Sequence, residues 1–143
     1  RFNNYNIDNS KIIFSPREKK RKNHFRMYNK IDISLDTFPY TGVTTSIESI
    51  WMGVPVLTLK GNNFVSRCGK SLNLNLGMPE LIAENKNDYI NKAIAMAKDK
   101  KKLETIRKSL RKKALSSPLF DMESFGHDFS NLLNNLWAKH PLK

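Results

Sequence analysis

Hydrophobic and polar positions along this chain switch between the period of a strand and that of a helix. Short apolar runs predict strands over residues 11–14, 31–36 and 54–59, and a short edge strand over residues 81–83. Apolar residues at helical spacing predict helices over residues 19–30, 44–53, 63–76, 88–98 and 100–115. Strands that alternate with helices in this way predict an α/β fold, a Rossmann-like parallel sheet with flanking helices.

The carboxyl-terminal end is predicted to be helical. Ser116-Ser117-Pro118 breaks the chain, and Asp121 can cap a new helix. The apolar residues of this helix recur at helical spacing, at Phe125, Phe129, Leu132 and Leu136, with Leu133 and Trp137 widening the face. We expect this face to pack on other protein, reaching beyond the local sheet to a neighbouring domain. Trp51 and Trp137 are both expected to be core residues.

The length of the chain, 143 residues, suits one domain and is too short for two full domains. The chain begins at Arg1 without a methionine and enters an apolar run almost at once. We therefore expect residues 1–143 to be a single-domain fragment of a longer protein.

The chain is strongly basic, with 25 Lys and Arg against 13 Asp and Glu and a formal net charge of +12. This charge favours anionic partners such as nucleotides, nucleic acid or acidic lipid, without choosing among them, and a solubilised surface would explain it equally well. Residues 98–113 are especially basic, but their narrow apolar stripe favours a solvated helix face over a nucleic-acid site.

Cysteine content and hydropathy indicate the compartment. The single cysteine, Cys68, rules out an intramolecular disulfide and gives no basis for a thiolate metal cluster, so a reducing compartment is expected. The chain has no run of about 18 apolar residues, and its amino terminus lacks a signal pattern. We expect a cytoplasmic protein with no membrane association.

A glycine and two threonines stand directly before the helix predicted to begin at Thr44. In an open parallel sheet, the loop holding Gly42, Val43, Thr44 and Thr45 would lie beyond the carboxyl end of a strand, where ligands bind. The free N–H groups and the dipole of a helix amino terminus attract an anion, and threonine hydroxyls can meet phosphate oxygens. The alternative is that Thr44 or Thr45 only caps the helix, which requires no ligand.

The stretch LDTFPYTGVTTSIESIWMGVPVLTLKGNNFVSRCGKSLNLNLGMPELIAENKNDY, residues 35–89, resembles the carboxyl-terminal part of O-linked N-acetylglucosamine transferases and their SPINDLY-like relatives, glycosyltransferase family 41. IIFSP upstream and SSPLFD downstream resemble the same family, so the likeness covers residues 11–137. It implies the donor-binding second domain of a GT-B enzyme, in which two Rossmann-like domains face each other. Such enzymes transfer a sugar from UDP to serine or threonine, or in one branch to asparagine, with inversion and without a metal.

The resemblance also implies a UDP-binding role for particular residues. Thr44 and Thr45 would hold the diphosphate, with Gly42 allowing close backbone approach. Glu48 falls where the family often has an aspartate on the ribose hydroxyls. Val43 replaces a histidine of the animal enzymes and can offer only its backbone N–H.

Upstream, three residues of the basic helix would complete the UDP site by resemblance. His24 matches a histidine that stacks on uracil, Arg21 aligns with a lysine near the ribose, and the backbone around Lys19 aligns with an edge contact to the base. Asp36 and Thr37 are expected to shape the turn, and Arg67 resembles an arginine of the family with no firm role.

The resemblance implies no catalytic residue within residues 1–143, because the acceptor-positioning groups and a lysine that the related enzymes place on the diphosphate would lie before Arg1. The expected partners are a UDP-sugar, a protein acceptor, the facing GT-B domain and tetratricopeptide-like repeats. Two other functions remain open. One is a nucleic-acid-binding module that uses residues 19–26 and 98–113, and the other is a degenerate scaffold whose donor site was lost at Val43 and Glu48.

Overall fold

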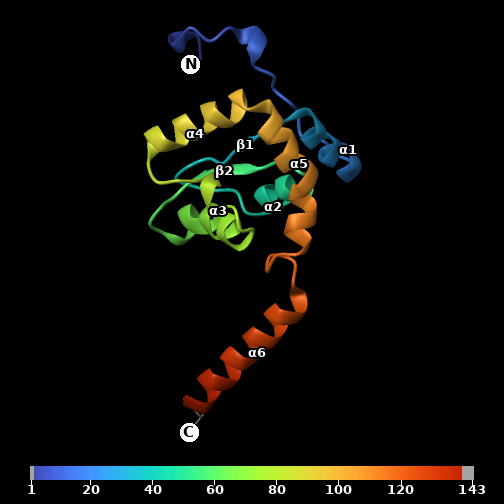
Figure 1. Ribbon diagram of the computed structural model, residues 1–143, viewed down its shortest axis with the longest axis vertical. Coiled ribbons are helices and arrows are strands. Elements are labelled where there is room, and N and C mark those ends of the chain that lie inside the picture. The colour runs from blue at the N-terminus through green and yellow to red at the C-terminus, as the bar shows by residue number, and fades with distance from the viewer. Residues whose placement is uncertain (1, 140–143) are drawn as a thin grey trace.

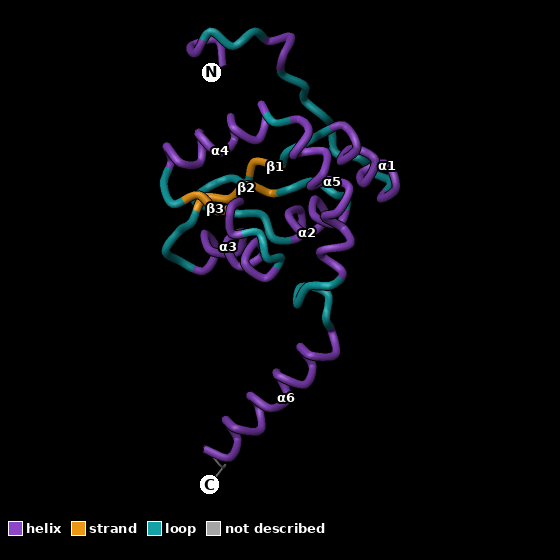
Figure 2. Tube along the Cα trace, in the orientation of Figure 1, coloured by secondary structure: helices purple, strands orange, loops and turns teal. Residues whose placement is uncertain are grey.

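A parallel sheet of three short strands forms the centre of the domain in the computed structural model, which describes residues 2–139. Its strands are β1 (Ser34–Leu35), β2 (Val56–Leu59) and β3 (Ile82–Ala83), in the order β1-β2-β3. Ser34 lies opposite Val56, and Thr58 opposite Ile82. Figure 2 shows the strands between helix α4 on one side and helices α2 and α3 on the other. The sheet therefore has helices on both faces, as a doubly wound fold requires.

Six α-helices surround or extend from this sheet: α1 (Arg21–Met27), α2 (Thr44–Trp51), α3 (Phe64–Asn75), α4 (Lys86–Lys98), α5 (Lys100–Leu115) and α6 (Met122–Lys139). Short 3-10 turns cover Phe2–Tyr5, Asn9–Lys11, Tyr28–Lys30 and Pro79–Leu81. Local sequence explains the helix starts: Asn63, Asn85 and Asp99 accept a backbone N–H from the first turn of α3, α4 and α5. Gly53 (φ 78°) and Gly77 (φ 67°) follow α2 and α3 in the left-handed conformation that glycine tolerates best.

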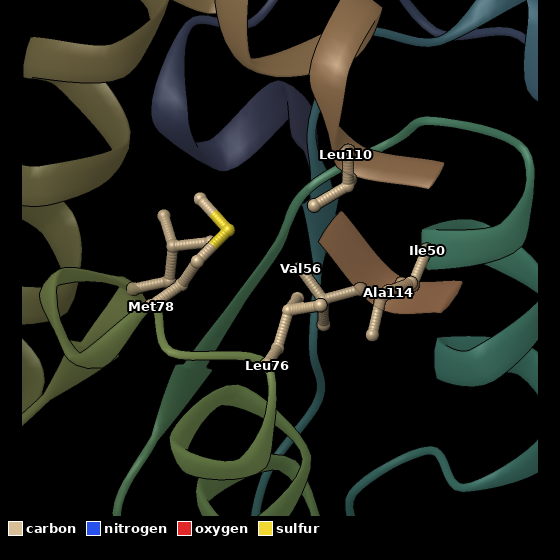
Figure 3. Close-up of a cluster of buried hydrophobic side chains, with 7 residues drawn as sticks. Ile50, Val56, Leu76, Met78, Leu110 and Ala114 are labelled. Atoms are coloured by element: carbon tan, nitrogen blue, oxygen red, sulfur yellow. The ribbon is translucent and has the colours of Figure 1, made fainter. Parts of the chain in front are cut away.

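The hydrophobic core lies between β2, α2, α5 and the segment after α3. Its buried members are Ile50, Val56, Leu76, Met78, Leu81, Leu110 and Ala114, most of which Figure 3 labels. A fully buried Leu, Ile or Val contributes about 1.5–3 kcal/mol relative to an exposed one, so this cluster holds α5 against the sheet layer. Trp51 is half-buried and packs on Phe120, a neighbour of the cluster, with ring centroids 5.4 Å apart. It therefore lies at the edge of the core and not within it.

The amino-terminal strand predicted over residues 11–14 is wrong. Residues 12–18 form no regular structure, and Ile13 and Phe14 are 89% and 84% exposed. A run of three apolar residues can form a strand only beside a partner strand, and no described strand pairs with this one. The strand predicted over residues 31–36 shortens to β1 because only Ser34 and Leu35 pair with β2.

Helix α6 extends away from the body of the domain (Figure 1). Its large apolar side chains are all exposed, from 49% at Leu136 to 76% at Met122. Trp137 is 59% exposed, so its predicted core position is wrong for the described residues. The apolar face itself agrees with the helical spacing read from the sequence. Across residues 2–139, no helix combines the length and apolarity needed to cross a membrane.

Candidate functional site

Hydrogen bonds of a buried aspartate fix the loop that connects β1 to α2. Asp36 follows β1 directly and is 6% exposed. Its Oδ1 accepts the Gly42 N–H at 2.8 Å, and its Oδ2 accepts the Thr58 hydroxyl at 2.8 Å. The Tyr89 hydroxyl donates to the Asp36 carbonyl at 2.9 Å. We call this set, Asp36 with Gly42, Thr58 and Tyr89, the Asp36 anchor.

The anchor confirms that Asp36 shapes the turn, and Thr37 does so too, because its hydroxyl donates to the Tyr40 carbonyl at 2.8 Å. Burial raises the pKa of Asp36 above its ordinary value of 3.8, although its hydrogen bonds from Gly42 and Thr58 act in the opposite direction. Burial, helped by the charge of Asp36, likewise raises the pKa of Tyr89 to about 12. The Tyr89 hydroxyl is therefore protonated at neutral pH and acts as a donor.

The opposite side of the same loop is open. Residues 43–45, which we call the lip, are exposed at the amino terminus of α2. Val43 occupies the N-cap position and makes no side-chain cap bond. Thr44 and Thr45 are the first two helical residues, and within residues 2–139 their side chains make no hydrogen bond. Capping therefore does not explain these two threonines, and the first-turn N–H groups have no side-chain acceptor.

Gly42 joins the anchor to the lip, and a side chain does not fit there. A Cβ at this position would lie 2.6 Å from the Thr45 Oγ1 and 2.8 Å from the Ser46 Oγ. Ser46 is buried, and its hydroxyl donates to the Gly42 carbonyl at 3.1 Å. The glycine thus lets the backbone pass close to these two hydroxyls as it turns into α2.

Helix α1 brings a histidine to the same end of the sheet. The His24 Nε2 lies 2.9 Å from the Glu48 Oε2, and the Tyr28 hydroxyl donates to that oxygen at 3.2 Å. Since a carboxylate only accepts, the His24 Nε2 carries the hydrogen of its bond. The His24 side chain is 40% exposed and that of Glu48 is 22% exposed. The structure thus brings together His24 and Glu48, two residues far apart in sequence.

The two basic residues expected near the ribose and the base are not joined to the rest of the candidate site by hydrogen bonds of their side chains among the described residues. Lys19 lies exposed before α1, and Arg21 is the exposed first residue of that helix. The Arg21 guanidinium lies over the Phe25 ring, 5.4 Å from its centroid. Among the described residues, neither side chain bonds to Glu48 or to the lip.

A hollow of about 660 Å³ adjoins the lip on the side of α3. Val43 and Phe64 line it together with Arg67 and Lys70, so it combines apolar walls with two positive charges. No group of three or more His, Cys, Asp or Glu within residues 2–139 is arranged to hold a metal ion.

Four of the eight basic side chains of α5 make contacts within the described residues. Arg107 bonds to the Ile31 carbonyl, Lys113 to the Gly77 carbonyl, and Lys108 pairs with Glu104. Arg111 stacks on Trp51, 4.2 Å from the ring centroid. The other four, Lys100, Lys101, Lys102 and Lys112, are exposed, in agreement with the solvated face expected for residues 98–113.

Sequence reasoning missed three residues that build the site. Tyr28 lies within the helix predicted over residues 19–30, and its spacing of four from His24 would place both on one helix face. Thr58 is a polar residue in an otherwise apolar strand, which signals a buried partner. Gly69 interrupts the helical pattern of α3, and it lies against Thr58 and Asp36 where a Cβ would come 2.8 Å from the Thr58 Cβ.

Comparison with known proteins gives the family. The model of glycosyl transferase family 41 matches residues 1–129. The chain belongs to glycosyltransferase family 41. A probable UDP-N-acetylglucosamine–peptide N-acetylglucosaminyltransferase SPINDLY of Hordeum vulgare is 35% identical over 134 residues, covering 94% of the chain and 14% of the relative. The UDP-N-acetylglucosamine–peptide N-acetylglucosaminyltransferase of Caenorhabditis elegans is 32% identical, with 94% and 12% covered.

Solved structures agree with this membership of family 41. A mutant O-GlcNAc transferase of Thermobaculum terrenum superposes with a TM-score of 0.76 at 36% identity. The match covers 82% of this chain and 23% of that protein. The predicted fold class, a Rossmann-like parallel sheet of a GT-B enzyme with a helical carboxyl end, is confirmed. This family 41 chain spans about one seventh of the length of the curated relatives it matches, 14% in the barley protein.

Proposed function

We propose that this chain is the UDP-sugar-binding part of an inverting protein glycosyltransferase. The whole protein transfers N-acetylglucosamine or another hexose from UDP to Ser or Thr, or to Asn, of an acceptor protein. The open lip is the observation that carries the proposal: two threonine hydroxyls and free first-turn N–H groups stand at the carboxyl end of a parallel strand, with no side chain of the described residues covering them. Membership of family 41 supports the same function.

In this proposal the lip binds the diphosphate. Thr44 and Thr45 donate their hydroxyls to phosphate oxygens, the N–H of Val43 adds a backbone donor, and Gly42 lets the phosphate approach. The α2 dipole and these donors stabilise the UDP leaving group electrostatically, so the reaction needs no metal cofactor.

On the nucleoside side, His24 provides a flat ring for uracil and Glu48 an acceptor for ribose hydroxyls. The backbone around Lys19 contacts the edge of the base, and the exposed Arg21 side chain turns toward the ribose on binding. The facing GT-B domain supplies the acceptor-positioning groups, so residues 1–143 alone bind UDP weakly and do not turn over. Tetratricopeptide-like repeats elsewhere in the protein hold the acceptor.

The test is calorimetric titration of UDP into the full-length protein and its Thr44→Val, Thr45→Val double variant. Each lost hydrogen bond to a charged group is worth about 1.5–3 kcal/mol, so UDP binding weakens at least about tenfold. Neither hydroxyl supports the fold, so the melting temperature stays within about 1 °C of the original.

Thr105→Val is the matched control, because Thr105 is an exposed threonine on α5 whose hydroxyl bonds only the Lys101 carbonyl. It leaves UDP affinity unchanged. Absence of UDP binding at millimolar nucleotide in the unmodified protein would overturn the proposed function, and unchanged binding in the double variant would overturn the role of the threonines.

A further inference from the structure

One carboxylate oxygen joins the two helices of the candidate site. Glu48 is on α2, one turn beyond the lip, and its Oε2 accepts from both His24 on α1 and Tyr28 just after α1. The same Tyr28 hydroxyl also lies 3.4 Å from the Thr45 carbonyl, in the lip. Tyr28 thus contacts the group that binds His24 and the backbone that carries the threonines.

These bonds also determine where α1 sits. Within residues 2–139, every side-chain hydrogen bond from residues 21–30 to the chain beyond Lys30 ends on Glu48 or on the Thr45 carbonyl. Helix α1 has no buried residue, so packing alone holds it weakly. The His24 and Tyr28 rings meet edge to face with centroids 5.6 Å apart, which orients the His24 ring further.

The chemistry of Tyr28 suits a permanent donor. Burial, together with the charge of Glu48, raises the pKa of Tyr28 to about 12. Its hydroxyl is therefore protonated throughout the neutral range and keeps the Glu48 Oε2 occupied. The other carboxylate oxygen, Oε1, has no hydrogen-bond partner among the described residues, which leaves an acceptor for a ligand hydroxyl.

From this geometry we propose that Tyr28 is a positioning residue. Acting through the Glu48 Oε2, it holds the His24 ring in register with the lip, so that the nucleobase and diphosphate ends of the site behave as one unit. Glu48 then has two roles: Oε2 orients His24, and Oε1 receives the ribose. The inference rests on the proposed UDP-binding function.

The experiment compares uridine and UDP as ligands of the full-length protein by calorimetry or NMR titration. Tyr28→Phe keeps the ring and removes only the hydroxyl. We expect it to lower the affinities for uridine and for UDP by the same factor, about 2- to 10-fold, which is the range of one net hydrogen bond. The Thr44→Val, Thr45→Val variant shows the complementary pattern: its affinity for UDP falls, and its affinity for uridine stays unchanged.

A double-mutant cycle tests whether Tyr28 acts through Glu48. In Glu48→Ala the target of the Tyr28 hydroxyl is gone, so adding Tyr28→Phe costs little further affinity. Glu48→Gln keeps one acceptor oxygen and gives an intermediate affinity. Tyr5→Phe is the control, because Tyr5 is 76% exposed and its hydroxyl makes no hydrogen bond in residues 2–139.

Three outcomes overturn the positioning role. The first is that Tyr28→Phe leaves the affinities for uridine and UDP unchanged. The second is that Tyr28→Phe lowers the affinity for UDP alone, which would place the action of Tyr28 on the lip. The third is that the affinity losses of Tyr28→Phe and Glu48→Ala are fully additive. A loss of affinity accompanied by a matching loss of melting temperature would show a merely structural role. Failure of the proposed function looks different, because the unmodified protein would then bind neither uridine nor UDP.

Discussion

The two sides of the loop between β1 and α2 differ in how their polar groups are satisfied. On the inner side, the Asp36 anchor pairs both carboxylate oxygens and the main-chain carbonyl of Asp36 with donors from the same chain. On the outer side, the lip leaves two hydroxyls and the first-turn N–H groups of α2 without a side-chain partner in the described residues. A single loop therefore separates groups that hold the fold from groups available to a ligand.

This difference means that mutations can separate stability from binding. Substitutions in the anchor leave buried polar groups without partners, and the free energy of unfolding falls. Substitutions in the lip remove groups that bond nothing within the described chain, so only ligand affinity changes. If variants of the anchor and of the lip each changed both the free energy of unfolding and the ligand affinity, the anchor and the lip would be one structural unit.

The largest expected effect on stability is that of Asp36→Ala. Loss of the carboxylate leaves the buried Thr58 hydroxyl and the Gly42 N–H unpaired, at about 1–3 kcal/mol each, so the free energy of unfolding falls by about 2–6 kcal/mol. Urea unfolding followed by circular dichroism measures this change. The lip variant Thr44→Val, Thr45→Val is the control, and its change stays below about 0.5 kcal/mol. Equal losses in both variants would contradict the comparison.

A smaller loss is expected for Gly69→Ala, which tests the anchor from the side of α3. The new methyl group overlaps the Thr58 side chain and the Asp36 Oδ2. Overpacking of this kind costs about 1–3 kcal/mol. Thermal unfolding should show a clearly lower melting temperature.

Gly126→Ala is the matched control for that substitution. Gly126 is also helical, in α6, but a Cβ there would meet nothing within 4 Å. Alanine is a better helix former by about 1 kcal/mol, so the control is neutral or slightly stabilising. A Gly69→Ala protein as stable as the control would mean that α3 shifts away from Asp36 without cost.

Much of the fold could be predicted from local sequence signals. The helix predicted over residues 100–115 coincides with α5, and the helix predicted over residues 63–76 contains α3 with its Asn63 cap. Both have strong periodicity and clear end signals. The strand predicted over residues 11–14 was wrong because a run of three apolar residues carries no information about a pairing partner, which is a property of the tertiary structure.

The candidate site was predictable in position but only partly in composition. Gly42, Thr44 and Thr45 were found because a loop before a helix has a known place in a parallel sheet. Tyr28 and Thr58 were not, since each bonds a residue at least 20 positions away in sequence. Such distant pairs follow from how the helices and strands pack and leave only faint marks in a single sequence.

The smallest expected effect is the pH dependence that Asp36 gives to stability. Because burial raises the pKa of Asp36 above 3.8, the folded state holds the proton more tightly than the unfolded state. The contribution of Asp36 to stability is therefore greatest below its unfolded pKa and falls as pH rises through the folded pKa. Five carboxylates have lowered pKa values, so their contributions to the stability of the fold are lost as pH falls. They are Asp8, Glu84, Asp88, Glu104 and Asp121.

Asp36→Asn isolates the Asp36 contribution from this background. Asparagine keeps an oxygen acceptor for the Gly42 N–H and can donate to the Thr58 hydroxyl, but it does not titrate. The difference in melting temperature between the original protein and this variant should move in favour of the original as pH falls from about 6 to about 3. A difference that stays constant over that range would mean that the hydrogen bonds of Asp36 balance its burial, and one that moves the other way would mean that they outweigh it. In the second case the anchor would stabilise the ionised carboxylate of Asp36. The inner side of the loop would then favour a negative charge, as the lip on the outer side is proposed to do for the diphosphate.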